Sequence, residues 1–162
     1  MTPCPNIVVF LPSFEKVAEF RQGLGDVFGI IAIGPASDAM GKLAGIDAFY
    51  LSLGRAERWG SRPIPPHTVA VLHTSQTDQQ SGIPPFVITG FLLKEGETPQ
   101  ADAVLPLLFN CVLDAVAEVN TQQPGAIRTV GFFAFELTAG GATSLANSAQ
   151  LLGQVVKKRS RQ

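Results

Sequence analysis

The chain has 162 residues, of which 46% are hydrophobic and 15% are charged, against about 25% charged residues in an average soluble domain. This length suits one domain, which can bury roughly 70% of the surface that its unfolded chain exposes. A formal net charge of −1 argues against nucleic acids and membrane surfaces as partners, because binding to either requires a basic face.

The N-terminal part of the chain predicts two buried strands joined by a helix. An apolar, β-branched run over 7–11 predicts the first strand. Ser13 is a good N-cap for a helix over 14–22, in which apolar residues recur at helical spacing. A second apolar run over 27–33 predicts another buried strand.

The middle of the chain predicts a pair of strands after a less regular stretch. We expect 34–45 to be a loop with one turn of helix. The segment 46–53 could be a helix or a strand, because its apolar residues fit either period poorly. The segments 68–74 and 86–93 are clear strand patterns, and a turn cluster over 77–85 separates them. These two strands are therefore predicted to pair antiparallel.

The C-terminal part predicts a helix over 99–120, a strand over 127–135, a Gly-rich turn over 137–143 and a helix over 144–158. Apolar strands that alternate with helices predict an α/β domain with a mixed, mainly parallel sheet and helices on both faces. The fold class is thus three-layer α/β/α.

We expect one domain over 1–162, with flexible ends at 1–5 and 159–162. Two cysteines, Cys4 and Cys111, do not suggest a disulfide framework. The chain shows no signal-peptide pattern and no apolar stretch of the ~20 residues needed to cross a bilayer, so we expect a cytoplasmic protein. The basic run at 157–161 is interpreted as a solvated helix end rather than a nucleic-acid-binding arm.

The common catalytic motifs do not occur in this sequence. His67 and His73 have no cysteine or acidic partner at metal-ligand spacing, so neither a metal site nor a cofactor is predicted. His73 is expected to be a strand residue with one hydrogen-bonded nitrogen. Cys111 lies in an apolar helical pattern, which should raise its pKa and make the thiol inert.

Two Gly-rich segments follow predicted strands, where ligands bind in parallel α/β sheets. One runs over 34–38 and continues through 41–47, and the other covers 138–142. Glycine lets backbone N–H groups approach a phosphate closely, and a following helix adds its positive dipole end. The alternative is that both segments are ordinary turns, in which glycine is the default residue.

At these residues the chain resembles a macrodomain, most closely the divergent macro-like group of bacteria and phages. Gly34-Pro35-Ala36-Ser37 stands at the Ser-Pro-Ala-Asn motif of that family, and Leu43-Ala44-Gly45-Ile46-Asp47 stands at its Asp-Gly-Gly-Ile-Asp motif. Thr138-Ala139-Gly140-Gly141, followed by an alanine-containing helix, matches the C-terminal family pattern. Ser37 replaces the family's ribose-binding asparagine, and Leu43 and Ala44 also depart from the motif.

The resemblance implies a cleft for ADP-ribose or a related nucleotide or phosphate ligand, between the loops 34–47 and 137–143. Backbone amides of both loops would cradle a diphosphate, and Asp26 is the candidate for contacting adenine. The implied ligand-binding residues are Ser37, Asp38, Gly45, Ile46, Asp47, Thr138, Ala139, Gly140, Gly141 and Ala142.

Three classes of function follow from the resemblance. The preferred class is a module that binds a nucleotide derivative. The second is a hydrolase of ADP-ribosylated or phosphorylated substrates, with Asp47 as the catalytic carboxylate; Asp47 could instead cap a helix over 48–53. The third is a macro-like fold without a ligand that serves as an oligomerisation or interaction domain, which the low charge and eleven phenylalanines favour.

Overall fold

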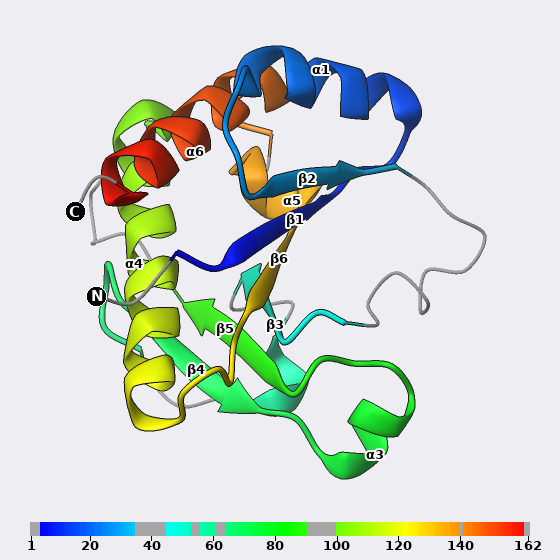
Figure 1. Cartoon of the computed structure of the whole chain (residues 1–162), viewed down its shortest axis with the longest axis vertical. Helices are drawn as coiled ribbons and strands as arrows, with labels where there is room; N and C mark the ends of the chain where they lie inside the picture. The colour runs from blue at the N-terminus through cyan, green and yellow to red at the C-terminus, as the bar shows by residue number, and fades with distance from the viewer. Residues whose placement is uncertain are drawn as a thin grey trace.

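The computed structural model describes residues 4–34, 45–52, 56–60, 64–90, 100–139 and 141–160. Its centre is one six-stranded sheet with the order β2-β1-β6-β3-β5-β4 (Figure 1). The strands are β1 (Asn6–Phe10), β2 (Ile30–Ile33), β3 (Ala48–Ser52), β4 (Val69–His73), β5 (Phe86–Gly90) and β6 (Thr129–Phe133).

Five of the six strands are parallel, and only β4 runs antiparallel to its neighbour β5. This confirms the mixed, mainly parallel sheet and the antiparallel pairing predicted for 68–74 and 86–93, of which 91–93 lies outside the described residues. The parallel strands all begin at one edge of the sheet, called the amino edge here, and end at the opposite, carboxyl edge. A loop therefore belongs to one edge or the other, depending on which end of a strand it adjoins.

The ambiguous segment 46–53 contains the strand β3, whose first four residues are all buried. A strand covered on both faces is apolar without alternation, which explains why its sequence fits neither periodicity. The strand predicted over 27–33 is shorter and less buried than expected. Only 30–33 pair with β1, and β2 is an edge strand, with Phe28 92% and Ile31 55% exposed.

Three long helices cover one face of the sheet: α1 (Phe14–Leu24), α4 (Ala101–Gln122) and α6 (Leu145–Ser160). Their buried side chains form the main core with the strand residues in register with Ile7. The helix α1 packs so closely on α6 that a Cβ on Gly23 would lie 2.0 Å from the carbonyl oxygen of Ala146. Figure 1 shows α1, α6 and α4 along the top and left of the sheet.

The opposite face carries a smaller core of Phe49, Leu51, Ala56 and Val87. The short helix η2 (Glu57–Trp59) packs onto it, with the Trp59 ring edge-on to Phe49 at a centroid distance of 6.0 Å. The helix α3 (Gln76–Gln80), which forms within the predicted turn over 77–85, lies beside η2. The sheet thus lies between two helical layers, as predicted, but the second layer is built from short helices.

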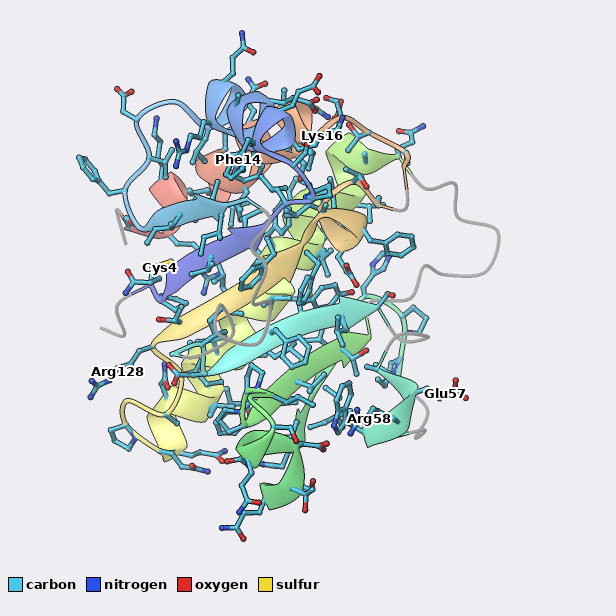
Figure 2. All side chains as sticks on the ribbon, turned by 90° about the vertical axis from the view of Figure 1, so that its right-hand side faces the viewer. Cys4, Phe14, Lys16, Glu57, Arg58 and Arg128 are labelled. Carbon is cyan, nitrogen blue, oxygen red and sulfur yellow. The ribbon has the colours of Figure 1, made fainter. Side chains whose placement is uncertain are left out.

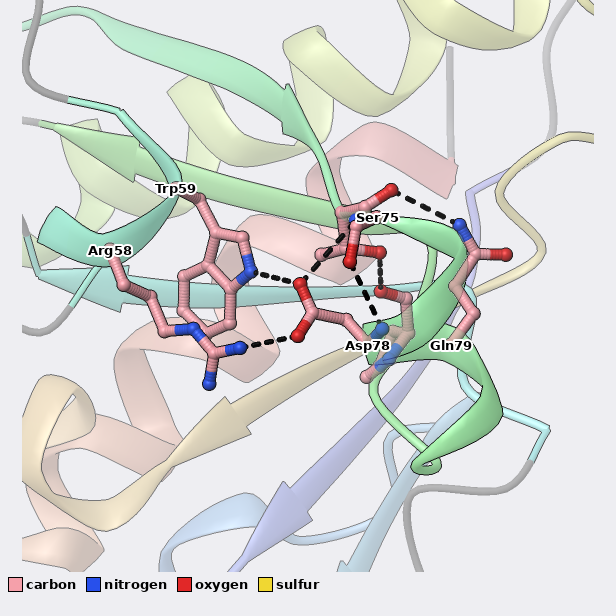
Figure 3. Close-up of polar contacts among 7 residues, drawn as sticks. Arg58, Trp59, Ser75, Asp78 and Gln79 are labelled. Atoms are coloured by element: carbon pink, nitrogen blue, oxygen red, sulfur yellow. Dashed lines mark hydrogen bonds and ion pairs between the residues drawn. The ribbon is translucent and has the colours of Figure 1, made fainter.

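Asp78 joins the two short helices of this second layer (Figure 3). Its carboxylate accepts a hydrogen bond from Trp59 Nε1 at 3.0 Å and pairs with the Arg58 guanidinium, while Ser75 and Asp78 form a reciprocal capping box at the start of α3. The Trp59 hydrogen bond, with smaller contributions from Ser75 and Arg58, holds the pKa of the Asp78 carboxyl below its usual value. This cluster fixes the helical cover on the smaller core.

The C-terminal elements depart from the predicted bounds in two places. The strand expected over 127–135 is β6 over 129–133, followed at once by the short helix α5 (Ala134–Leu137). The helix α6 continues to Ser160, so 159–160 is not a flexible end. Arg159 holds this last turn against α4, because its Nη1 lies 2.9 Å from Asp114 Oδ1. None of the helices in the described part of the chain is long and apolar enough to span a membrane.

Candidate functional site

The carboxyl edge of the sheet contains a cavity of about 440 Å³, beside the ends of the neighbouring strands β1 and β6. Figure 2 looks at the strands from the side: Cys4 and Arg128, which precede β1 and β6, lie on the left, and Lys16 lies near the other end of the strands. Ligands of open parallel sheets bind at this edge. The cavity is lined by Pro12, Lys16, Glu19, Ala134, Phe135, Thr138, Thr143, Ser144 and Leu145.

Two helices begin beside this cavity. Ser13 caps α1 by accepting a hydrogen bond from Lys16 N at 3.2 Å, and Ser144 caps α6 by accepting one from Asn147 N at 3.1 Å. The first turns of both helices contribute lining residues. Because the N-terminus of a helix carries a partial positive charge, both helices raise the electrostatic potential in the cavity.

Lys16 and Glu19 form the charged wall of the cavity. Lys16 Nζ lies 3.4 Å from Glu19 Oε1, and the other carboxylate oxygen, Oε2, accepts a hydrogen bond from Leu145 N at 3.0 Å. Glu19 therefore occupies, from within the protein, the position that an anion takes at the N-terminus of a helix. Sequence reasoning missed both residues, because they lie on α1 and reach the site only through its packing against α6.

In the second Gly-rich loop, two of the amides predicted to cradle a phosphate already have acceptors within the protein. Ala139 N donates to Glu136 O, and Gly141 N donates to Thr138 O, so these amides are used inside the turn. Gly140 lies outside the described residues, and Ala142 is exposed. Thr138, by contrast, lines the cavity. The loop follows α5 at the carboxyl edge, so its place relative to the sheet agrees with the prediction.

The first Gly-rich loop does not supply the other wall of this site within the described residues. Gly45, Ile46 and Asp47 precede β3 and therefore lie at the amino edge. The strand β6, which separates the two edges beside β3, is five residues long, so the edges lie about 13 Å apart at ~3.3 Å per residue. Ser37 and Asp38 lie outside the described residues. The structure thus separates the Gly45–Asp47 segment from the 138–143 turn.

Asp47 binds the backbone of a neighbouring strand. Its Oδ2 accepts hydrogen bonds from Arg128 N at 2.8 Å and Thr129 N at 3.1 Å, and its own backbone N–H donates to Thr129 O at 3.0 Å. The prediction that Asp47 caps a helix is wrong, because 48–52 is a strand. Asp26, the candidate for contacting adenine, is exposed in the loop before β2 and also lies at the amino edge.

The carboxyl edge also holds a buried acidic residue that the sequence analysis did not single out. Glu136, in α5, is only 5% exposed, and its Oε1 accepts a hydrogen bond from Ser52 N at the end of β3. It does not line the cavity, whereas the flanking Phe135 does and is 54% exposed. A single charge within the apolar run 132–137 was the available signal for a buried carboxylate.

The remaining nucleophilic and metal-ligating candidates occupy separate places. Burial raises the pKa of the Cys111 thiol, as predicted, and its Sγ donates to His67 O at 3.3 Å. His73 is exposed at the end of β4, with its ring 5.0 Å from that of Phe86. Among the described residues, no group of three or more His, Cys, Asp and Glu side chains is placed to hold a metal ion.

Comparison of the chain with protein-family models, with curated proteins and with solved structures found no match.

Proposed function

We propose that this chain binds a small anionic ligand, a nucleotide derivative or another phosphate-bearing molecule, in the cavity at the carboxyl edge. The observation that carries the proposal is the convergence of two helix N-termini and the Lys16 ammonium on one cavity of about 440 Å³. Both features attract negative charge, and the volume falls within the ~300–1,000 Å³ range of small-molecule sites.

The positions of Glu19 and Phe135 support the proposal that the ligand is a phosphate with an attached ring system. A phosphate would compete with the Glu19 carboxylate for Leu145 N and Lys16 Nζ, the two donors that Glu19 now contacts. The half-exposed ring of Phe135 offers an apolar surface on which a base could stack. Thr138 and Ser144 add hydroxyl groups to the wall.

Isothermal titration calorimetry tests this proposal with inorganic phosphate, ADP and ADP-ribose, using adenosine as the uncharged comparison. The phosphorylated ligands should bind and adenosine should not. Because the Lys16 side chain is 47% exposed, Lys16→Met should weaken binding by only about 0.5–1 kcal/mol, or about two- to fivefold. Lys157→Met, at the far end of α6, is the matched control and should leave binding unchanged.

The Glu19→Gln variant gives the sharper test, because it removes a charge that competes with the ligand. It should tighten the binding of ADP and lower the stability of α6, whose first N–H loses a charged acceptor. If none of the phosphorylated ligands releases or absorbs heat, or if Glu19→Gln weakens their binding as Lys16→Met does, the proposal fails.

Self-association is a second candidate function, supported by the exposed apolar residues of the β2 edge. Phe28 is 92% and Ile31 is 55% exposed, and within the described part of the chain no strand lies beyond β2. Two copies could pair their β2 strands antiparallel about a twofold axis. Size-exclusion chromatography with light scattering should then give a dimer that Ile31→Lys converts to a monomer. Even weak dimers form at a concentration of about 100 µM. If the wild-type protein is monomeric at that concentration, this candidate is excluded.

A further inference from the structure

A second cavity, of about 550 Å³, lies between the edge strand β4 and the helix α4 and shares no lining residue with the carboxyl-edge cavity. Figure 1 shows β4 at the edge of the sheet beside the C-terminal half of α4. We call this cavity the β4–α4 groove. It is lined by Ile64, Pro65, Thr68, Val69, Ala70, Val71, His73, Phe86, Ala115, Glu118, Val119, Gln122 and Gln123.

Within the described part of the chain, no strand pairs with the outer side of β4, which faces this groove. Thr74 N donates to Pro85 O at 3.0 Å, which marks Thr74 as a residue whose backbone faces β5. Backbone direction alternates along an antiparallel pair, so the N–H and C=O groups of Val69, Val71 and His73 face away from β5. All three of these residues line the groove, and an edge strand with such groups is a template for another strand.

The side chains at the bottom of the groove are apolar and incompletely covered. Val69, Val71 and Val119 pack against the main core and yet remain partly exposed. Ala115, Glu118 and Val119 bring one face of α4 to the groove, opposite the β4 residues. An added strand would therefore place alternate side chains on an apolar floor between β4 and α4.

The charges around the groove favour a cationic occupant. Among the residues that the structure describes, Glu118 is the only carboxylate that lines the groove, no lysine or arginine lines it, and no cation pairs with Glu118. The helix α4 ends at Gln122, and its last turn carries no basic residue to balance the negative end of the helix dipole. A basic side chain of a partner would meet both sources of negative potential.

We propose that the β4–α4 groove binds an extended peptide segment of a partner protein by strand addition to β4. The peptide backbone pairs with Val69, Val71 and His73. Its alternate side chains, small or β-branched, contact Val119 and Ala115, and a lysine or arginine reaches Glu118. Strand addition draws its affinity from main-chain hydrogen bonds and its specificity from such alternate side-chain contacts.

A displayed library of random ten-residue peptides, selected on the full chain, tests this proposal. Enriched peptides should share one basic position within an alternating β-branched pattern. Because Glu118 is exposed, a synthetic peptide of the enriched sequence should lose about two- to fivefold of its affinity for Glu118→Gln. It should remain unaffected by Glu57→Gln, which alters an exposed carboxylate on η2. N-methylation of the peptide at alternate residues should abolish binding in one phase of the alternation and spare it in the other.

Hydrogen exchange locates the bound peptide independently of affinity. The amides of Val69, Val71 and His73 should become protected when the synthetic peptide is added, while those of β2, the opposite edge, should not change. The proposal is overturned if selection enriches no common pattern. It is also overturned if neither Glu118→Gln nor N-methylation changes the affinity for the peptide, or if the peptide protects amides of β2 in place of those of β4.

Discussion

Replacing Asp47 by alanine separates a structural role of this residue from the ligand-binding or catalytic role that the family resemblance implies. The Asp47 carboxylate accepts two backbone hydrogen bonds, from Arg128 N at 2.8 Å and from Thr129 N at 3.1 Å, and so holds the start of β6 against the start of β3. Asp47→Ala removes both bonds. It leaves the backbone pairing of Asp47 N with Thr129 O available.

The expected cost follows from the exposure of the two donors. A hydrogen bond to a charged group contributes about 1.5–3 kcal/mol, but Arg128 is exposed, so water can replace the acceptor at its N–H. The N–H of Thr129, a residue that is only partly exposed, recovers less of this hydrogen-bond energy from water. We therefore expect Asp47→Ala to lower the free energy of unfolding by about 1.5–3 kcal/mol in total, which lowers Tm by roughly 3–12 °C in a domain of this size.

Urea denaturation and thermal unfolding measure this cost, and calorimetry with ADP measures binding on the same variant. Asp47→Asn keeps one side-chain oxygen as an acceptor and should cost about half as much. Asp26→Ala, an exposed aspartate at the same edge, should change stability by less than about 0.5 kcal/mol. If Asp47→Ala leaves stability unchanged but weakens ADP binding, the carboxylate faces a ligand and the structural reasoning is refuted.

Two further predictions concern packing and pH. Gly23→Ala should destabilise the protein by about 1–3 kcal/mol in urea denaturation, despite the better helix propensity of alanine, because the new Cβ would lie 2.0 Å from the Ala146 carbonyl oxygen. Gly153→Ala should cost less, because the nearest atom to its Cβ would be Val27 Cγ2, in a side chain, at 3.0 Å; equal costs would contradict this packing. Since the pKa of Asp78 lies below its unfolded value, its contribution to stability is present above the unfolded pKa and is lost as pH falls through the folded one. Fluorescence of the single tryptophan, Trp59, should follow this acid transition, and an Asp78→Asn variant with the same acid transition would disprove the assignment.

Apolar periodicity and the turn residues between the segments predicted the order of the main elements, because each long element has a strong local pattern. The predictions that failed concern features that depend on the position of a strand in the whole sheet. The segment 46–53 was ambiguous because β3 is a central strand buried on both faces, and Phe28 and Ile31 were expected to be buried because their apolar character does not reveal that β2 is an edge strand. Strand order decides both outcomes, and it depends on contacts between residues far apart in the sequence.

The helices α3 and α5 escaped prediction because short helices depend on caps and tertiary contacts rather than on amphipathic periodicity. In α3, the Ser75–Asp78 capping box was legible in the sequence as Ser-x-x-Asp, a pattern close to the common capping box. The second role of Asp78 could not be predicted from this pattern, because Asp78 also binds Trp59 and Arg58, which follow a different strand. A cap that is also a tertiary anchor can be assigned only when both partners are seen.

The candidate site shows most clearly why a loop motif alone does not locate a ligand. Glycine in the segments 41–47 and 138–142 suggested two loops that face each other, but in a parallel sheet the ends of a loop that leads from one strand to the next lie at opposite edges. The segment Gly45–Asp47 therefore reaches the amino edge, and the turn at 138–143 stays at the carboxyl edge. The partner of that turn is the helix α1, which brings Lys16 and Glu19 to the N-terminus of α6. Because Glu19 already accepts the hydrogen bond from Leu145 N, the proposed binding of an anion in this cavity requires that the Glu19 carboxylate be displaced from that N–H.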